Sequence, residues 1–221
     1  MLLSFFISLF PVFFLFIFTL LMISCFFKRD IITVRFKKLF FIGMLNFIIT
    51  KFVVLFIHFF YKINFDKIPL FFYLWISEIL VFTVFILFTY KLLIRWGLLR
   101  PDSYREYPYI FSYTSGFFVL TGLTKVVGSQ LKLDSYILFI YPLVSLILLI
   151  LYSIILLEAG TRRDYKSYLL YSVLLPLSLL LALIPWLYYI NYIKASIGLA
   201  GIILIGSFVV FFLLKKDYIR S

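Results

Sequence analysis

The chain has 221 residues, of which 65% are hydrophobic, 23% aromatic and only 14% charged, so it is far more apolar than a soluble domain. A water-soluble fold of this size could not bury so much apolar surface, so we expect an all-α fold, a polytopic transmembrane helix bundle in which residues 1–221 form a single integral membrane domain. The formal net charge of +12 falls in short Lys and Arg clusters between apolar runs, which indicates membrane topology and makes nucleic acid an unexpected partner.

The first apolar run extends from about Ser4 to Phe27 and contains Cys25, the single cysteine. A secretory signal carries basic residues ahead of its apolar run, whereas Met1 to Phe27 has none and the basic cluster follows it. We expect a retained first helix, although the stretch from Met22 to Cys25 also resembles a lipoprotein cleavage box. One cysteine excludes an intrachain disulfide and a thiolate metal cluster, and we expect no cofactor.

Six further apolar runs have the length that a helix needs to cross a bilayer core, about 20 residues for about 30 Å. They are Leu39–Tyr61, Pro69–Lys91, Tyr107–Val127, Ser135–Leu157, Ser167–Ile190 and Ala195–Leu214. The short links between them make consecutive helices antiparallel neighbours. The run from Tyr107 contains the polar stretch Ser112 to Gly116, so we expect it to be buried among other helices. Six spans are the alternative if this run does not cross fully.

The number of basic residues differs sharply between alternate links, which predicts the orientation of the chain. One set holds fifteen: Lys28, Arg29, Arg35, Lys37, Lys38, Lys91, Arg95, Arg100, Arg105, Arg162, Arg163, Lys166, Lys215, Lys216 and Arg220. The other set holds four: Lys62, Lys67, Lys132 and Lys194. Lys and Arg are retained on the cytoplasmic side of a membrane, so the fifteen-residue set marks the cytoplasmic links. We therefore expect seven spans, with the N-terminus outside and the C-terminus cytoplasmic. The expected location is the cell (cytoplasmic) membrane, which is the inner membrane of a cell with two.

Proline and glycine residues inside the runs predict local features of helix packing. Proline removes a backbone donor and can kink a helix, and four prolines lie inside runs: Pro11, Pro142, Pro176 and Pro185. Glycine allows close approach of a neighbouring helix, and the last run has Gly198, Gly201 and Gly206, although not at GxxxG spacing. We expect ordinary packing at these glycines.

Four ionisable residues inside the runs form the candidate site: Lys51, His58, Glu78 and Lys125. A charge near the bilayer centre costs at least about 2.5–3.5 kcal/mol, so such a group needs a partner or water. Lys51 lies about 18 Å from the inner start of its run and Glu78 about 13–14 Å from the outer start of the next, a similar depth in a core of about 30–33 Å. We therefore predict a Lys51–Glu78 ion pair, with His58 on nearly the same helix face as Lys51 and Lys125 near the outer end.

This polar strip has two interpretations. In the structural one, the ion pair neutralises two charges and fixes the register of two helices. In the functional one, Glu, His and Lys form a proton or ion relay of the kind found in transporters. Catalysis has less support, because a metal hydrolase needs several His or carboxylate ligands and a Ser115 nucleophile would have only His58 as its base. We assign no catalytic, cofactor-binding or metal-binding residue.

The layout of the runs from Leu39 to Trp186 resembles that of multi-spanning intramembrane proteases of the YhfC and PrsW type. In those families the equivalent of the third span bears a paired-glutamate motif, and later spans carry histidines or glutamates. Here Ser77-Glu78-Ile79 supplies one glutamate, Ser115-Gly116 stands where a His-Gly or Gly-Glu element is expected, and the later runs contain no histidine. The resemblance therefore implies a relative without proteolytic activity, and Glu78 alone is carried over.

The sequence favours a non-enzymatic integral membrane protein that acts as a partner or subunit. One alternative is a small-solute permease or transporter component whose route is lined by the Lys, Glu and His strip, and a second is a divergent intramembrane hydrolase. The expected partners are the lipid bilayer and a membrane or cytoplasmic protein. The link from Arg95 to Tyr109, with Trp96 and basic residues, could touch anionic headgroups or a docked protein.

Overall fold

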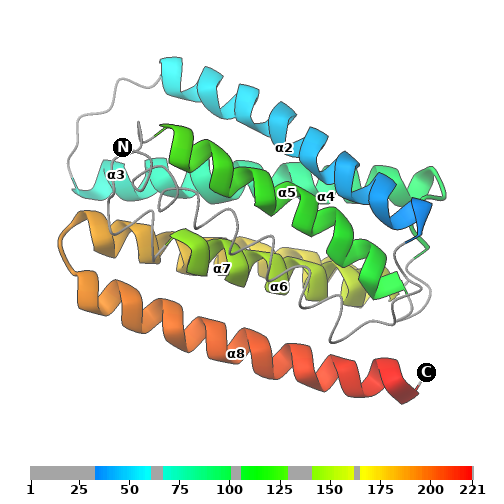
Figure 1. Cartoon of the computed structure of the whole chain (residues 1–221). Coiled ribbons are helices and arrows are strands. Elements are labelled where there is room, and N and C mark those ends of the chain that lie inside the picture. The colour runs from blue at the N-terminus through cyan, green and yellow to red at the C-terminus, as the bar shows by residue number, and fades with distance from the viewer. Residues whose placement is uncertain (1–32, 61–66, 101–105, 129–140, 162–164, 221) are drawn as a thin grey trace, which may run out of the picture.

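The structure is a computed structural model that describes residues 33–60, 67–100, 106–128, 141–161 and 165–220. Within these ranges all regular secondary structure is helical (Figure 1). The elements are α2 (Val34–Phe60), α3 (Lys67–Leu74), the π-helix η2 (Trp75–Leu80), α4 (Val81–Arg95), α5 (Tyr107–Gly128), α6 (Tyr141–Thr161), α7 (Tyr165–Tyr189) and α8 (Ile193–Arg220). The all-α prediction is confirmed for the described part of the chain.

Each predicted run after the first overlaps a helix, and α3, η2 and α4 follow one another without a break. Tyr61 and residues 135–140 of the predicted runs lie outside the described residues. The first run, with Pro11 and Cys25, lies outside the described residues. Among the described residues, two helices are long and apolar enough to cross a membrane, Val34–Phe56 and Leu70–Arg95. Shorter apolar helices are Val144–Ala159, Pro176–Tyr189 and Ile193–Val209.

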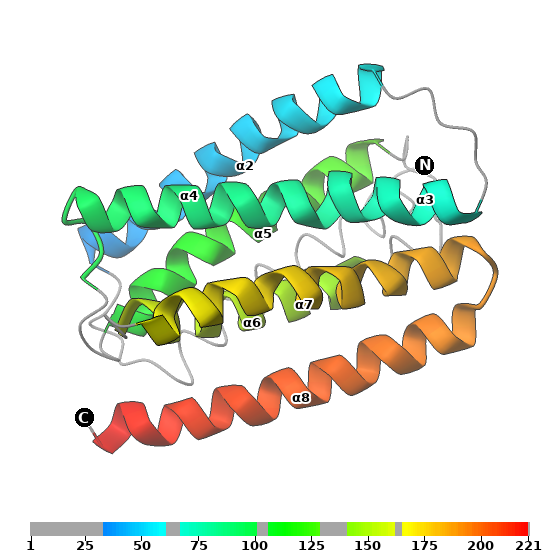
Figure 2. The same ribbon diagram turned by 180° about the vertical axis from the view of Figure 1, so that it is seen from behind.

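The helices form a bundle in which α5 lies between α2 and α6 (Figure 1). The reverse view shows α4 beside α2, α3 beside α7, and α8 at the opposite edge against α6 and α7 (Figure 2). Consecutive helices run antiparallel, so the start of α2, the end of α4, the start of α5 and the end of α8 lie at one end, which we call the α4–α5 end. The turn between α7 and α8 lies at the opposite end, the α7–α8 end.

Aromatic side chains join α2, α4 and α5 in the core. The rings of Phe47, Phe82 and Phe117 meet edge to face, with centroids 5.4 to 5.9 Å apart, and all three are buried. This arrangement lets the positive edge of one ring meet the negative face of the next. One phenylalanine from each helix therefore fixes the spacing of the three.

Two glycines bring α2 and α5 into backbone contact. A Cβ atom added to Gly43 would overlap the Tyr113 carbonyl and lie 2.9 Å from the Phe117 nitrogen. One added to Gly116 would overlap the Phe40 carbonyl of α2. Close helix approach of this kind is typical of small residues in membrane bundles.

The three glycines of α8 do not bring a neighbouring helix close. A Cβ atom added to Gly198, Gly201 or Gly206 meets no atom within 4 Å. This agrees with the expectation of ordinary packing at these positions and not with the close approach that glycine allows. The physical reason is that α8 lies at the edge of the bundle.

Two helix ends are closed by residues with positive φ. Gly97 has φ +68°, and the Leu98 and Gly97 N–H groups donate to the Leu93 and Ile94 carbonyls, a Schellman motif that ends α4. Asn191, with φ 69°, occupies the same position after α7. The turn at Asn191 reverses the chain between Tyr189 and Ile193, as the short links predict.

Three of the four prolines inside predicted runs lie in described helices. Pro176 and Pro185 lie inside α7, where each removes a backbone donor. Pro142 is the second described residue of α6, and the residues before Tyr141 lie outside the described part of the chain. The kink predicted at Pro142 therefore stays a prediction.

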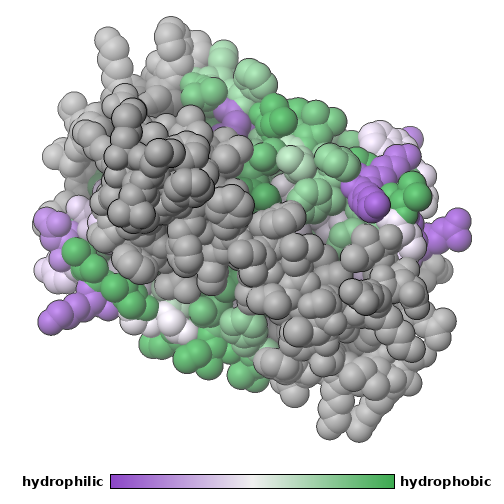
Figure 3. Space-filling model, in the orientation of Figure 1, coloured by the Kyte–Doolittle hydropathy of each residue, from purple (hydrophilic) through white to green (hydrophobic). Residues whose placement is uncertain are grey.

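Large apolar side chains remain exposed along the outer helices. Phe41 is 65% exposed, Phe52 69%, Phe88 61% and Ile202 70%. In the space-filling view, hydrophobic surface fills the middle of the described part and hydrophilic residues gather mostly towards its two ends (Figure 3). This pattern is the reverse of a soluble bundle, whose outward faces are polar.

Candidate functional site

Lys51 lies in α2 at a half-buried position. Its Nζ atom is 5.5 Å from the centroid of the Phe47 ring and 5.3 Å from that of the Phe82 ring. An ammonium group within about 6 Å of a ring centroid is attracted by the ring quadrupole, more strongly where water is excluded. Since Phe47 belongs to α2 and Phe82 to α4, the Lys51 cation lies at the interface of these two helices.

Glu78 lies in the π-helix η2, which joins α3 to α4. The Val81 N–H group donates to the Ile76 carbonyl, the i→i−5 bond that defines such a helix. π-helices are rare and occur frequently at functional sites. η2 contacts α2, and Glu78 precedes Phe82 by four residues, so the two positions lie on nearly the same face of the helix.

The backbone positions of Lys51 and Glu78 therefore lie on contacting elements. The side chains of His58, Glu78 and Lys125 fall outside the described residues, so the Lys51–Glu78 ion pair and the polar strip stay predictions. The sequence does not predict the π-helix, because Trp75–Leu80 contains no glycine or proline to mark an irregular turn.

A hydrogen bond holds η2 against α7. The Trp75 Nε1–H group donates to Ser178 Oγ of α7 at 2.9 Å, and Ser178 is buried. Within the helix, the Ser77 hydroxyl donates to the Tyr73 carbonyl at 2.7 Å. The π-helix is thus attached to α7 on one side and contacts α2 on another.

A buried amide connects α2, α4 and α5 about one turn from Lys51. The Asn46 Nδ2 group donates to the Tyr113 hydroxyl at 2.8 Å and to the Phe85 carbonyl at 3.3 Å. Asn46 Oδ1 accepts from the Thr89 hydroxyl at 3.0 Å, and the Tyr113 hydroxyl donates to the Ile86 carbonyl at 3.2 Å. Every partner is a side chain or carbonyl of the bundle, so this amide joins helices.

Similar bonds join α4 and α5 to α6. The Tyr90 hydroxyl donates to the Leu156 carbonyl at 2.7 Å, and the Thr83 and Tyr152 hydroxyls share a hydrogen bond. The Thr114 and Ser153 hydroxyls lie 2.6 Å apart. Polar side chains therefore form hydrogen bonds across the α4–α6 and α5–α6 interfaces.

The polar stretch Ser112 to Gly116 is buried in the middle of the bundle, which confirms that part of the sequence analysis. Ser112 donates to the Phe36 carbonyl of α2 at 2.7 Å. Ser115 donates to the Phe111 carbonyl of its own helix at 2.6 Å. The two hydroxyls thus stabilise the helix and its contact with α2.

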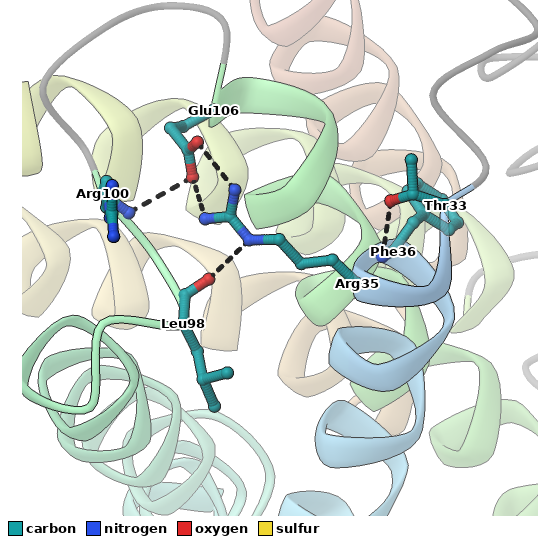
Figure 4. A network of polar contacts seen from close by, with 6 residues as sticks. All are labelled: Thr33, Arg35, Phe36, Leu98, Arg100 and Glu106. Atoms are coloured by element: carbon teal, nitrogen blue, oxygen red, sulfur yellow. Dashed lines mark hydrogen bonds and ion pairs between the residues drawn. The ribbon is translucent and has the colours of Figure 1, made fainter.

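An ion pair closes the α4–α5 end (Figure 4). The Arg35 guanidinium of α2 donates to both Glu106 carboxylate oxygens, at 3.0 and 2.6 Å, and its Nε–H group donates to the Leu98 carbonyl at 2.8 Å. The guanidinium carbon also lies 4.4 Å from the centroid of the Tyr109 ring. The Arg100 N–H group donates to Glu106 Oε2 at 3.2 Å. We call these contacts the Arg35 clamp.

From the sequence alone, Arg35 is predicted only as a topological charge, and nothing singles out Glu106. Both residues lie in links assigned to the same side of the membrane, and their opposite charges are the one signal that could have suggested a pair. Because 71 positions separate them, the pairing depends on how α2, α4 and α5 pack.

Among the described residues, no group of three or more His, Cys, Asp and Glu side chains lies where it could hold a metal ion. In the described site, the Lys51 cation lies at the α2–α4 interface next to the π-helix η2. The chemistry that it can support is the stabilisation of a nearby negative charge. Comparison of the chain with protein-family models, curated proteins and solved structures finds no match.

Proposed function

We propose that the chain is a multi-pass integral membrane protein that acts as a non-enzymatic partner or subunit of a membrane assembly. The exposure of its apolar helices is the observation that carries the membrane placement. In Val34–Phe56, 28% of an 18-residue apolar stretch is buried, and in Leu70–Arg95 35% of such a stretch is buried. The core helix of a soluble protein would be mostly buried, and large exposed apolar surfaces mark contact with lipid or another protein.

The positions of the charged residues support seven spans with a cytoplasmic C-terminus. Lys37, Lys38, Arg95 and Arg100 are exposed at the α4–α5 end, whereas Lys194 is exposed at the α7–α8 end. The excess of basic residues at the α4–α5 end supports its assignment to the cytoplasmic side. With α3, η2 and α4 taken as one span, the proposal assigns six spans to the described helices and a seventh to the predicted first run.

The interior supports a role in assembly over one in catalysis. Asn46, Thr89 and Tyr113 bond to one another and to helix carbonyls, and hydroxyls of α4 and α5 bond to α6. Such bonds stabilise one arrangement of helices in an environment without water. A membrane subunit needs this kind of fixed bundle, with apolar helix faces left for its neighbours.

A second candidate function is a permease or transporter component. The π-helix at Glu78 favours it, because an irregular turn beside the Lys51 cation is unusual in a purely structural helix. In this proposal Lys51 and Glu78 exchange a proton or bind an ion near the middle of the membrane. A divergent intramembrane hydrolase is the weakest proposal. It depends on the resemblance to intramembrane proteases, and this chain lacks most of their motif residues.

Replacement of Glu78 by Gln distinguishes the two functions. If Lys51 and Glu78 form a structural pair, Glu78→Gln leaves a lysine without its counter-charge in the membrane and lowers the abundance of the protein. The double replacement Lys51→Glu with Glu78→Lys then restores abundance. If the pair is a relay, Glu78→Gln folds normally but abolishes proton movement into proteoliposomes that contain a pH-sensitive dye.

Membrane fractionation and native purification test the first proposal. We expect the chain to stay with membranes after carbonate washing and to co-purify with a stoichiometric protein partner in mild detergent. Release of the chain by carbonate would contradict the membrane placement. Purification as an isolated monomer with dye-detected proton movement would favour the permease instead.

A further inference from the structure

The contact between α2 and α4 sets the register of their cytoplasm-facing halves. Asn46 of α2 bonds to Phe85 and Thr89 of α4, so the midpoint of those two α4 residues lies level with Asn46. Lys38 precedes Asn46 by eight residues along α2. Arg95 follows the midpoint between Phe85 and Thr89 by eight residues along α4. At a rise of about 1.5 Å per residue, both basic residues lie about 12 Å from the Asn46 level, towards the α4–α5 end.

Lys38 and Arg95 lie on the outer side of this helix pair. Gly43 turns the opposite side of α2 towards α5, and Tyr90 turns the opposite side of α4 towards α6. At about 100° per residue, Lys38 lies about 80° from Asn46 on the side away from Gly43. Lys38 and Arg95 are both exposed, and among the described residues neither forms an ion pair.

An exposed apolar strip continues from each basic residue towards the middle of the bundle. On α2 it contains Leu45, 57% exposed, and Ile49, 48% exposed, at the i+7 and i+11 positions from Lys38. On α4 it contains Phe88, 61% exposed, and Val84, 54% exposed, on the same face as Arg95. Lys38 and Arg95 thus lie at the ends of two parallel apolar strips, on the side of the α4–α5 end.

We propose that the outer face of the α2–α4 pair binds an anionic phospholipid such as phosphatidylglycerol. This inference rests on the proposed membrane placement. The lipid phosphate lies between Lys38 and Arg95, and one acyl chain runs along Leu45 and Phe88. Trp96, which is 63% exposed directly after Arg95, lies at headgroup level, where an indole ring has both apolar and polar neighbours. The Arg35 clamp fixes the end of α4 relative to α2 and thereby the distance between the two cations.

The test uses the full chain in detergent and counts bound phosphatidylglycerol and phosphatidylcholine by native mass spectrometry. We expect Lys38→Gln and Arg95→Gln each to weaken phosphatidylglycerol binding about fivefold, the equivalent of about 1 kcal/mol per basic residue at a membrane surface. Phosphatidylcholine binding should not change. Phe88→Ala should weaken both lipids, since it shortens the apolar strip.

Lys37→Gln is the matched control, because Lys37 is the adjacent exposed lysine on α2 but lies about 180° from Asn46 and away from α4. Equal losses in Lys37→Gln and Lys38→Gln would overturn the site in favour of unspecific surface charge.

Displacement of the lipid by millimolar inorganic phosphate would overturn a lipid ligand in favour of a free anion. A chain that resists carbonate extraction but binds both lipids equally refutes the lipid site alone, whereas a chain released by carbonate refutes the membrane placement.

Discussion

One arginine connects three segments of the chain at the α4–α5 end. Arg35 bonds to Glu106 at the start of α5 and to the Leu98 carbonyl just after α4, and its own helix begins one residue earlier. The side chain of Glu106 is 14% exposed and that of Arg35 32%, so water screens the pair only in part. A bidentate pair with an additional carbonyl acceptor stabilises more than an exposed pair, whose contribution is about 0–1 kcal/mol.

We predict that Glu106→Gln lowers the free energy of unfolding by about 1–2 kcal/mol, because a neutral amide keeps one acceptor but loses the charge of the carboxylate. The measurement is the thermal midpoint of the purified protein in detergent. Arg100→Gln is the control, since Arg100 contacts Glu106 through its backbone N–H group, which the replacement retains. Equal destabilisation by both changes would refute the clamp.

Arg35→Lys tests the geometry of the same clamp. A lysine keeps the positive charge but cannot donate to two carboxylate oxygens and the Leu98 carbonyl in one plane, nor stack on Tyr109 as a guanidinium does. We expect Arg35→Lys to recover less than half of the stability lost in Arg35→Gln, measured by the same thermal midpoint. Full recovery would show that charge alone holds the segments.

At the scale of elements, the contact between α2 and α5 explains why a polar helix lies at the centre of the bundle. Gly43 and Gly116 bring the two backbones together, which places Ser112 within reach of the Phe36 carbonyl and Tyr113 within reach of Asn46. A helix rich in hydroxyl groups would be costly against lipid, where each unbonded polar group costs several kcal/mol. Buried between α2 and α6, its polar side chains find partners instead.

We predict that Gly43→Ala and Gly116→Ala each destabilise the protein by about 3 kcal/mol or more, because the added methyl group meets backbone atoms that cannot rotate away. Gly198→Ala is the control, since nothing lies within 4 Å of its added Cβ atom, and it should change stability little. Thermal unfolding in detergent and the yield of monodisperse protein measure the effect. Equal behaviour of the three variants would refute backbone contact between α2 and α5.

Sequence patterns predict the helices better than their contacts, and the reason is physical. Apolar length and short links depend on the bilayer thickness and on local chain geometry, so Tyr107–Val127 coincides closely with α5. With the proposed membrane placement, the burial of Ser112 to Gly116 is expected from the cost of polar groups in lipid. Which glycines meet a neighbour, where a π-turn interrupts α3 and α4, and which carboxylate meets Arg35 all depend on tertiary packing, which one sequence does not contain.

At the scale of the whole molecule, the two ends of the bundle differ in charge. The α4–α5 end carries exposed Lys37, Lys38, Arg95 and Arg100, whereas exposed Tyr189 and Tyr192 flank the α7–α8 turn. Tyrosine side chains at headgroup depth anchor a bundle on either side of a membrane, but basic residues are retained on the cytoplasmic side. The asymmetry in charge therefore gives a definite orientation to test.

We predict that cysteines placed at the two ends react from opposite sides of the membrane. In a Cys25→Ser background, Tyr192→Cys should react with a membrane-impermeant maleimide on intact cells, because the α7–α8 turn faces outward in the proposed orientation. Arg100→Cys should react only after permeabilisation, since it lies just after the Schellman turn of α4 at the opposite end. The reverse pattern would invert the orientation while keeping the bundle. Labelling of both positions in intact cells would contradict any arrangement in which the described helices cross the membrane from one end to the other.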